Sequence, residues 1–568
     1  MTEQRNLILA IVLSVAIMLG FQLLFEGPPP PPAPQQTQEQ PATAPTAGIG
    51  APTPAVPAGA APTTPDRKAA LAEGGRVRID TPRLHGSISL AGGRIDDLTL
   101  VDYHERPDPK SPEIELLSPP RAPHPYYVEF GWVPAAPGIA VPDEQTLWTA
   151  SGGALTPSSP VTLTWDNGQG LRFVRTIGID ENYMFTVTQR VENAGAEPVT
   201  LHPYSLILRT GTPETAGFYI LHEGPLGVFD NTLKEIDYDD LQEAGTINAT
   251  STGGWIGITD KYWLTALIPD QQESVAGRFS HRRAGEVSKY QADFMGAART
   301  VAPGGSVEAK NFVFAGAKEV RLLDGYSETY GIQRFDLAID FGWFYFLTKP
   351  FFYLLQILNA ALGNFGLAIM ALTVIIKLVF FPLANKSYVA MSKMKKLQPE
   401  MKKLQERFGD DKVRMNQELM ALYKREKANP VAGCLPIVIQ IPVFFALYKV
   451  LFVTIEMRHA PFYGWIKDLS APDPTTVFNL FGVIPWDPPS FLMIGVWPLI
   501  MGLTMWIQQK LNPAPADPVQ ARMFMFLPIV FTFLLAAFPA GLVIYWAWSN
   551  ALSILQQWVI MKRMGVKA

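Results

Sequence analysis

Long apolar segments near the end of the chain constrain its fold more than any other feature. Residues 365–383 read FGLAIMALTVIIKLVFFPL, and Lys377 is the only charged residue in this run. As a helix the run would span roughly 28 Å, enough to cross a bilayer. Further apolar segments are 431–452, 491–509, 523–538 and 541–561. The pattern predicts a helical membrane bundle. A charged side chain at the centre of a membrane-spanning helix costs about 2.5 kcal/mol or more. Lys377 is therefore the first candidate for a functional residue.

The beginning of the chain predicts an anchor followed by a linker. Residues 7–25 are apolar and end in Leu24, Phe25 and Glu26, without the small residues of a signal-peptide cleavage site. We therefore expect an uncleaved transmembrane anchor over 1–26, with a cleaved signal peptide as the alternative. Residues 27–65 contain thirteen prolines and one charge, so 27–75 is expected to be an extended linker.

Residues 76–330 show short alternating strands separated by turn residues. The runs 161–165 and 171–177 flank Asn167-Gly168, a strong hairpin signal. Residues 183–191 alternate in the same way, and 255–268 supply two more apolar runs. We expect a β-sandwich that acts as a scaffold or docking domain.

The remaining sequence predicts the order of the membrane segments. The aromatic stretch 340–363 resembles a helix lying at the membrane surface. The further expected segments are transmembrane helices at 364–384, 430–453, 491–509, 523–538 and 541–561, a helical hairpin at 385–429, loops at 454–490 and 510–522, and a short basic tail at 562–568.

Charge distribution predicts the orientation of these segments. Residues 385–429 contain twelve Lys or Arg and six Asp or Glu, whereas the loop 454–490 has no excess of positive charge. The positive-inside rule then places the hairpin, the tail and both termini in the cytoplasm. The sandwich lies outside, which in a bacterial cell means the periplasm.

Polar residues on three expected spans predict a hydrated concavity. Thr373 lies one helical turn before Lys377, and Gln440 lies inside the next span. The last span carries a polar stripe of Trp546, Ser549 or Asn550, Ser553 and Gln557. Two alternatives remain: the uncharged residues hold helices together, and Lys377 extends its stem toward the cytoplasmic surface.

The hairpin predicts an adaptable apolar surface. Its methionines at helical spacing include Met391, Met394, Met401 and Met415, and such side chains suit varied partners. The alternative is that they pack the two helices against each other. The basic residues suit anionic lipid or ribosomal RNA, although a solvated loop that sets orientation is the more ordinary explanation.

Several classes of function lack support in the sequence. Cys434 is the only cysteine, the histidines form no close pair, and no Walker loop, GxGxxG or nucleophile elbow occurs. We therefore expect no enzyme activity, no cofactor or metal, and no recognition of a specific nucleic acid sequence. A transporter or channel for a small solute is the main alternative. The later spans contain no acidic residue, which argues against ion coupling.

The chain resembles the YidC/Oxa/Alb family of membrane protein insertases. The resemblance is carried by LTVIIKLVFFPL (372–383), by the segment 393–448, by APFYGWIKDLS (460–470) and by FPAGLVIYWAWSNALSILQQ (538–557). It implies a periplasmic β-supersandwich, an interfacial helix, five core spans and a cytoplasmic hairpin. It also implies insertion and folding of client membrane proteins through a hydrophilic groove, alone or beside the Sec translocon.

The resemblance places Lys377 at the position of the family's groove charge. We expect Thr373, Gln440, Trp546, Asn550, Ser553 and Gln557 to line the same groove, and the hairpin methionines to contact clients. Many family members carry arginine in place of Lys377, and the tyrosine of the last span aligns with Trp546. Implied partners are client membrane proteins, the Sec translocon with its associated subunits, the ribosome and signal recognition machinery, and anionic lipids. A non-inserting assembly scaffold is a further alternative.

Overall fold

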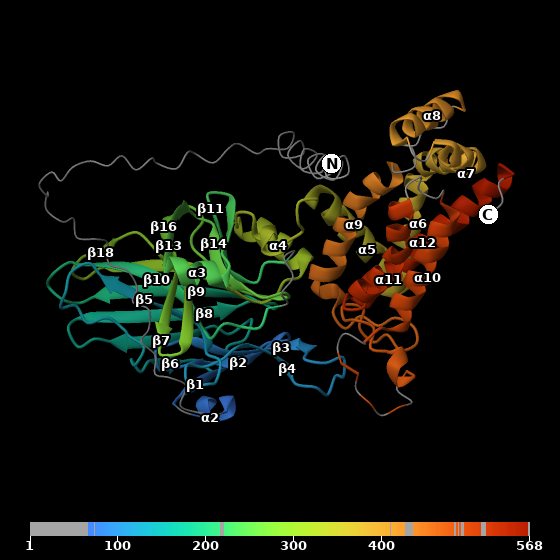
Figure 1. Cartoon of the computed structure of the whole chain (residues 1–568). Coiled ribbons are helices and arrows are strands. Elements are labelled where there is room, and N and C mark those ends of the chain that lie inside the picture. The colour runs from blue at the N-terminus through green and yellow to red at the C-terminus, as the bar shows by residue number, and fades with distance from the viewer. Residues whose placement is uncertain are drawn as a thin grey trace, which may run out of the picture. The chain divides into compact units, whose positions relative to one another are not determined.

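A computed structural model describes residues 66–72, 74–215, 221–408, 411–426, 435–481, 484, 486, 488–489, 493–512 and 518–565. The expected anchor (1–26), most of the expected linker, Cys434 and the end of the basic tail lie outside these residues. Figure 1 shows the strands in the part coloured blue to green, and the helices that follow them in yellow to red.

Residues 76–317 form two antiparallel sheets. Among the described residues the larger has ten strands, with the order β1-β2-β3-β5-β10-β17-β16-β13, while β18 pairs with β10 and β4 with β3. Its strands are β1 (Arg76–Asp80), β2 (Leu84–Ser89), β3 (Ile95–His104), β4 (Glu113–Leu117), β5 (Tyr126–Pro134), β10 (Val199–Thr210), β13 (Thr246–Thr252), β16 (Ser274–Ala284), β17 (Val287–Met295) and β18 (Arg299–Val301).

The second sheet has nine strands in the described residues, ordered β12-β11-β14-β15-β19-β9-β8-β7-β6. They are β6 (Thr149–Ser151), β7 (Val161–Asp166), β8 (Leu171–Ile179), β9 (Met184–Asn193), β11 (Gly224–Phe229), β12 (Thr232–Glu235), β14 (Trp255–Thr259), β15 (Trp263–Ile268) and β19 (Ser306–Ala317). Fully buried residues of both sheets, such as Val128, Ile207, Phe185 and Val313, share one core. The predicted β-sandwich is confirmed.

The hairpin predicted around Asn167-Gly168 is also confirmed. β7 and β8 pair in register from Val161 opposite Ile177 to Asp166 opposite Arg172. The Asn167 side chain accepts hydrogen bonds from the backbone N–H groups of Gln169 and Leu171, and Gly168 adopts a positive φ of 70°. These are the roles for which asparagine and glycine are favoured in turns.

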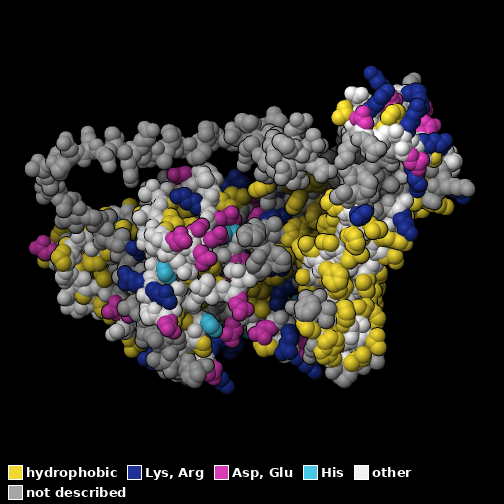
Figure 2. Space-filling model, in the orientation of Figure 1, with side chains coloured by type: hydrophobic (Ala, Val, Ile, Leu, Met, Phe, Trp, Pro, Cys, Tyr) yellow, Lys and Arg dark blue, Asp and Glu magenta, His cyan; other side chains and the backbone are white. Residues whose placement is uncertain are grey.

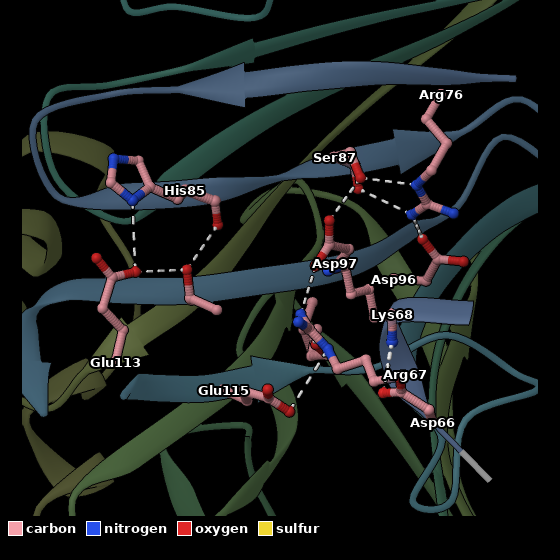
Figure 3. Close-up of polar contacts among 12 residues, drawn as sticks. Asp66, Arg67, Lys68, Arg76, His85, Ser87, Asp96, Asp97, Glu113 and Glu115 are labelled. Atoms are coloured by element: carbon pink, nitrogen blue, oxygen red, sulfur yellow. Dashed lines mark hydrogen bonds and ion pairs between the residues drawn. The ribbon is translucent and has the colours of Figure 1, made fainter. Parts of the chain in front are cut away.

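Ion pairs to Asp97 and Asp96 of β3 hold the first described helix, α2 (Arg67–Leu71), and strand β1 to the larger sheet (Figure 3). Arg67 pairs with Asp97, and Arg76 pairs with Asp96. Ser87 lies between the two pairs: it accepts from Arg76 Nε at 2.7 Å and donates to Asp97 at 2.5 Å. The pairs hold the chain to the sandwich where it leaves the expected linker.

Helices make up most of the chain after the sandwich. The described α-helices beyond α2 are α3 (Tyr238–Ala244), which lies between strands, and then α4 (Val320–Tyr330), α5 (Tyr345–Leu362), α6 (Phe365–Val379), α7 (Phe381–Phe408), α8 (Lys412–Arg425), α9 (Leu435–Val453), α10 (Val496–Leu511), α11 (Pro518–Leu535) and α12 (Ala540–Arg563). Three 3₁₀ turns are also described: η1 (Phe335–Ala338), η3 (Ile455–Met457) and η4 (Val477–Asn479).

A break divides the apolar run 365–383 into two helices. α6 ends at Val379 and α7 begins at Phe381, with a bend of 70° between them. Pro382, the second residue of α7, explains the break, because it has no N–H to donate to the carbonyl of Leu378. The sequence had predicted one continuous helix over 364–384, so this break was not expected.

Length and hydropathy limit which of the described helices could cross a membrane. In the described part of the chain no single helix is long and apolar enough to do so by itself, whereas α6 and α7 meet the requirements together as a bent pair.

Candidate functional site: a polar cavity between helices

A cavity lies between α6, α9, α12 and the start of α7. Its volume is about 570 Å³, including its open mouth. The lining residues are Thr373, Ile376, Lys377, Phe380, Leu383, Ala384, Tyr388, Gln440, Val443, Tyr545, Ser549 and Gln556. The lining includes both polar and apolar side chains, and none of them is acidic.

Lys377 reaches into this cavity from the last turn of α6. Its ammonium donates a hydrogen bond of 2.7 Å to Ser553 Oγ on α12, and Ser553 in turn donates to the carbonyl of Ser549 at 2.9 Å. Within the described residues Lys377 forms no ion pair. Because α6 ends at Val379, the ammonium also lies near the negative end of the helix dipole, which favours a positive charge.

A second polar contact crosses the cavity from α9 to α12. Gln440 Nε2 donates to Ser549 Oγ at 3.2 Å, and the Tyr545 hydroxyl interacts with both of these residues. Thr373 is buried and donates to the carbonyl of Ile369 at 2.7 Å, so its hydroxyl is already used within α6. Lys377, Thr373 and Gln440 thus line one cavity, and Ser553 is bonded to Lys377.

The expected polar stripe on α12 divides into two faces. Ser549 and Gln556 line the cavity, and Ser553 binds Lys377. Asn550 instead donates to Thr504 of α10 at 3.4 Å, and Gln557 donates to Asn512 at 3.1 Å. Successive helical residues differ by about 100° around the axis, so neighbours in sequence face different helices.

Trp546 lies on this second face. Its ring contacts Phe444 of α9 at 4.9 Å and Phe531 of α11 at 5.6 Å, measured between ring centroids. The neighbouring Tyr545 occupies the cavity wall in its place. The sequence analysis did not identify Tyr545. A clue was available, because Tyr545, Ser549 and Gln556 recur at helical spacing.

The elbow between α6 and α7 forms one end of the cavity. Phe380, Leu383, Ala384 and Tyr388 all contribute lining side chains there. Tyr388 is buried and interacts with Ser553, the residue that also binds Lys377. The sequence analysis assigned Tyr388 to the hairpin and missed this contact.

The expected hairpin methionines mostly pack α7 against α8. Met401 is buried in a cluster with Leu397, Leu419 and Leu422, and Met394 and Met415 pack at its edge. The Tyr423 hydroxyl lies 3.6 Å from Met401 Sδ. Met391 lies elsewhere, with its sulfur 4.0 Å from Ser387 Oγ. This arrangement favours the alternative that the stripe joins the two helices.

Comparison with known proteins identifies the family. A family model described as the YidC periplasmic domain matches residues 76–354, and one described as the 60Kd inner membrane protein matches 357–567. The membrane protein insertase YidC of Methylobacterium sp. strain 4-46 is 52% identical over 600 aligned positions, covering 100% of this chain and 96% of that protein. The chain belongs to the YidC family.

Other members and one solved structure extend the comparison. The membrane protein insertase YidC of Beijerinckia indica subsp. indica is 54% identical over 585 positions, covering 100% of this chain and 97% of that protein. A crystal structure described as active YidC insertase with the first transmembrane domain resolved is 18% identical, with a TM-score of 0.35, and covers 84% of this chain and 91% of that one. The family assignment rests on the sequence relatives.

YidC family membership places the chain among inner membrane proteins. The periplasmic-domain model ends at 354 and the inner-membrane model begins at 357, so both boundaries fall within α5. α5 therefore joins the two parts of the chain. No cluster of three or more metal-binding side chains occurs among the described residues.

Proposed function

We propose that this chain inserts client membrane proteins by admitting their polar segments into the cavity around Lys377. One observation carries the proposal: a lysine ammonium lies in the cavity wall with a neutral hydroxyl as its acceptor. An ammonium has three N–H donors, and in the described residues Lys377 uses one of them. The others remain available to a carboxylate or carbonyl of a client.

The arrangement is proposed to work by lowering the cost of moving polar groups through the bilayer. A polar outer segment of the client enters the cavity, while its apolar helix slides along the lipid-facing side of the bundle. The expected fifth span, 523–538, is short, which reduces the apolar distance to be crossed. Partition of the apolar helix into lipid then drives the reaction without nucleotide.

The exposed surface of the helices supports a lipid-facing side. Figure 2 shows hydrophobic side chains gathered over the region where Figure 1 labels α9, α10 and α11. The exposed large apolar residues of α10 and α11 include Leu499, Leu503, Trp506, Phe526, Ile529, Val530, Phe533 and Leu534. We propose that five core spans and an N-terminal anchor cross the membrane, with the sandwich in the periplasm and both termini in the cytoplasm.

The hairpin is proposed to provide the cytoplasmic contact surface. Lys402, Lys403, Arg407, Lys424 and Arg425 are exposed on it, and they suit anionic lipid headgroups or ribosomal RNA. Contacts with the ribosome, the signal recognition machinery and the Sec translocon are part of this proposal.

Reconstitution tests the function directly. Purified full-length protein in liposomes should insert a single-span client without ATP, scored by protection of the client from added protease. Lys377→Ala should reduce insertion of a client with an acidic outer segment by roughly tenfold, as expected for loss of a hydrogen bond to a charged group. Lys377→Arg should insert it normally, because the positive charge is kept.

A matched client with a neutral outer segment provides the control and should be inserted almost equally by all three proteins. Equal activity of Lys377→Ala on both clients would remove the proposed role of the ammonium. Solute flux without insertion would indicate a transporter, and client crosslinking without insertion would indicate a scaffold.

A further inference from the structure

The segment 460–475, between α9 and α10, binds the N-terminal ends of three helices. A helix N-terminus carries N–H groups without intrahelical acceptors, and each one left unpaired within a membrane costs several kcal/mol. Because these termini also carry partial positive charge, an end where three of them meet requires acceptors and negative charge. We call residues 460–475 the cap.

Two carbonyls of the cap bind the start of α12. Ala540 N–H donates to the carbonyl of Ala471 at 2.7 Å, and Gly541 N–H donates to that of Leu469 at 2.9 Å. Leu469 and Ile466 of the cap are fully buried. The first turn of α12 is therefore paired with the cap rather than with water.

The start of α6 is held in a similar way. Asn364 caps α6 by accepting from Leu367 N–H at 3.1 Å, and its amide group donates to the carbonyl of Pro461 at 3.1 Å. The Phe462 ring lies over Gly366, where an added Cβ would be only 2.0 Å from a ring carbon. Glycine is required at this position for the cap to approach α6 so closely.

Asp473 joins the cap to α10 and supplies the negative charge. One carboxylate oxygen accepts from Trp497 N–H in the first turn of α10 at 2.9 Å. The other accepts from Trp465 Nε1 at 3.1 Å and from the Thr475 hydroxyl at 2.7 Å, both within the cap. Asp473 is buried and lies against Gly495, where an added Cβ would be 2.4 Å from the carboxylate carbon.

A short apolar layer separates the cap from the polar cavity. Gly366 precedes Thr373 by seven residues and Gly541 precedes Tyr545 by four, which correspond to roughly 10 Å and 6 Å of helix rise. The side chains in this layer include Ile369, Leu372, Leu542 and Ile544, and all are almost completely buried. A polar cavity this close to one membrane surface needs a continuous closure on that side.

We propose that the cap is the permeability seal of the cavity, and that Asp473 is the positioning residue that holds it on α10. This inference rests on the proposed function, because it requires the bundle to cross a membrane with its cavity open toward the cytoplasm. The seal lets polar client segments enter on one side while protons and ions are kept from crossing. Breaking the contact of Asp473 opens a leak through the bundle.

Ion leak measured in liposomes tests the proposal without any client. Full-length protein is reconstituted in vesicles containing a pH-sensitive dye, and proton entry is followed after a potential is imposed. Asp473→Ala removes the carboxylate, and Gly495→Ala displaces it by placing a Cβ against it. Each variant should raise the leak several-fold above wild type. Lys467→Ala changes an exposed residue of the same cap and should leave the leak unchanged.

Milder variants protect the test against misfolding. Asp473→Asn keeps one carbonyl-type acceptor, and Trp465→Phe removes only the indole donor, so both should fold and leak to an intermediate extent. Thermal unfolding in detergent establishes that each variant tested is folded. Wild-type leak in the folded variants would overturn the proposal and leave the cap a purely structural element.

The insertion assay in the same vesicles separates this inference from the function on which it rests. If the variants leak but the wild-type protein inserts no client, the proposed function is contradicted and the proposal that the cap is a seal is supported. Insertion by the wild type, together with folded variants that do not leak, would contradict the seal alone.

Discussion

At the scale of single residues, the adjacent aromatic side chains Tyr545 and Trp546 lie in different environments. Tyr545 lines the cavity, and Trp546 packs between helices. The Tyr545 hydroxyl interacts with Gln440 and Ser549 in the cavity, whereas Trp546 packs against Phe444 and Phe531. Tyr545→Phe should therefore reduce client insertion about two- to tenfold, corresponding to one hydrogen bond of about 0.5–1.5 kcal/mol. The liposome insertion assay measures this effect.

Trp546→Phe is the matched control, because it changes the residue next to Tyr545 and retains an aromatic ring at that position. It should lower thermal stability while leaving insertion within about twofold of wild type, since no hydrogen-bonding group of the cavity is lost. A larger loss of insertion in Trp546→Phe than in Tyr545→Phe would show that the sequence alignment identified the functional position correctly.

The positions of these residues show what the sequence could predict about the site. Lys377, Thr373, Gln440 and Ser553 were found because polar groups in apolar helices are rare and visible. The assignment of Tyr545 and Trp546 required the rotation of α12, and a shift of one residue turns a side chain by about 100°. The rotation of α12 about its axis depends on how it packs against α9, α10 and α11. The sequence of α12 alone carries no information about that packing.

Lys318 provides a prediction of pH dependence within the sandwich. Its side chain is almost completely buried and donates to Thr259 Oγ1 at 2.8 Å, and burial lowers the pKa of Lys318 from its usual 10.5 to about 8. Between pH 8 and 10.5 the unfolded chain binds more protons at this site than the folded chain does. Stability should therefore rise with pH across this window, by at most about 3 kcal/mol, and be independent of this group below pH 8.

Lys318→Met should remove this contribution and stabilise the sandwich at pH 7. Thermal unfolding of the full-length protein from pH 7 to 10 measures it as the difference between variant and wild type. Lys310→Met, an exposed substitution on strand β19, which ends just before Lys318, should leave the wild-type profile unchanged. A constant difference between Lys318→Met and wild type at every pH would contradict the prediction.

At the scale of elements, the hairpin of α7 and α8 should behave as a small packed unit. Met401 is 5% exposed in its core, whereas Met420 is 60% exposed on its surface. Met401→Ala should destabilise the packing by about 2–5 kcal/mol, as expected for a buried methionine, and Met420→Ala by much less. Hydrogen exchange of the α8 amides in the full-length protein measures both effects, and unchanged exchange in Met401→Ala would refute the packed arrangement.

The same elements show where sequence patterns reach their limit. Alternation and turn residues predicted the β7–β8 hairpin, because those signals are local to the strands and the turn between them. The break at Phe380 was missed because hydropathy continues through Pro382, although the proline removes a helical hydrogen bond. Residues 460–475 were expected to lie in a loop without positive excess, part of which carries the family resemblance. Their role as a cap was not predicted, since the bonds to α6, α10 and α12 join residues far apart in the chain.

At the scale of the whole molecule, the distribution of charge makes a prediction about orientation. The hairpin region 385–429 has twelve basic and six acidic residues, whereas the cap carries Lys467 against Asp468 and Asp473. Only the hairpin has the positive excess that retains a loop in the cytoplasm. The two regions should therefore lie on opposite sides of the membrane.

Cysteine labelling tests this orientation, because Cys434 is the only cysteine and Cys434→Ser gives a thiol-free background. Lys467→Cys and Lys424→Cys each place one thiol at an exposed position, the first in the cap and the second on α8. In cells with only the outer membrane permeabilised, an impermeant maleimide should label Lys467→Cys and not Lys424→Cys. Lysis should make both positions react. Labelling of Lys424→Cys before lysis, without labelling of Lys467→Cys, would show the opposite orientation.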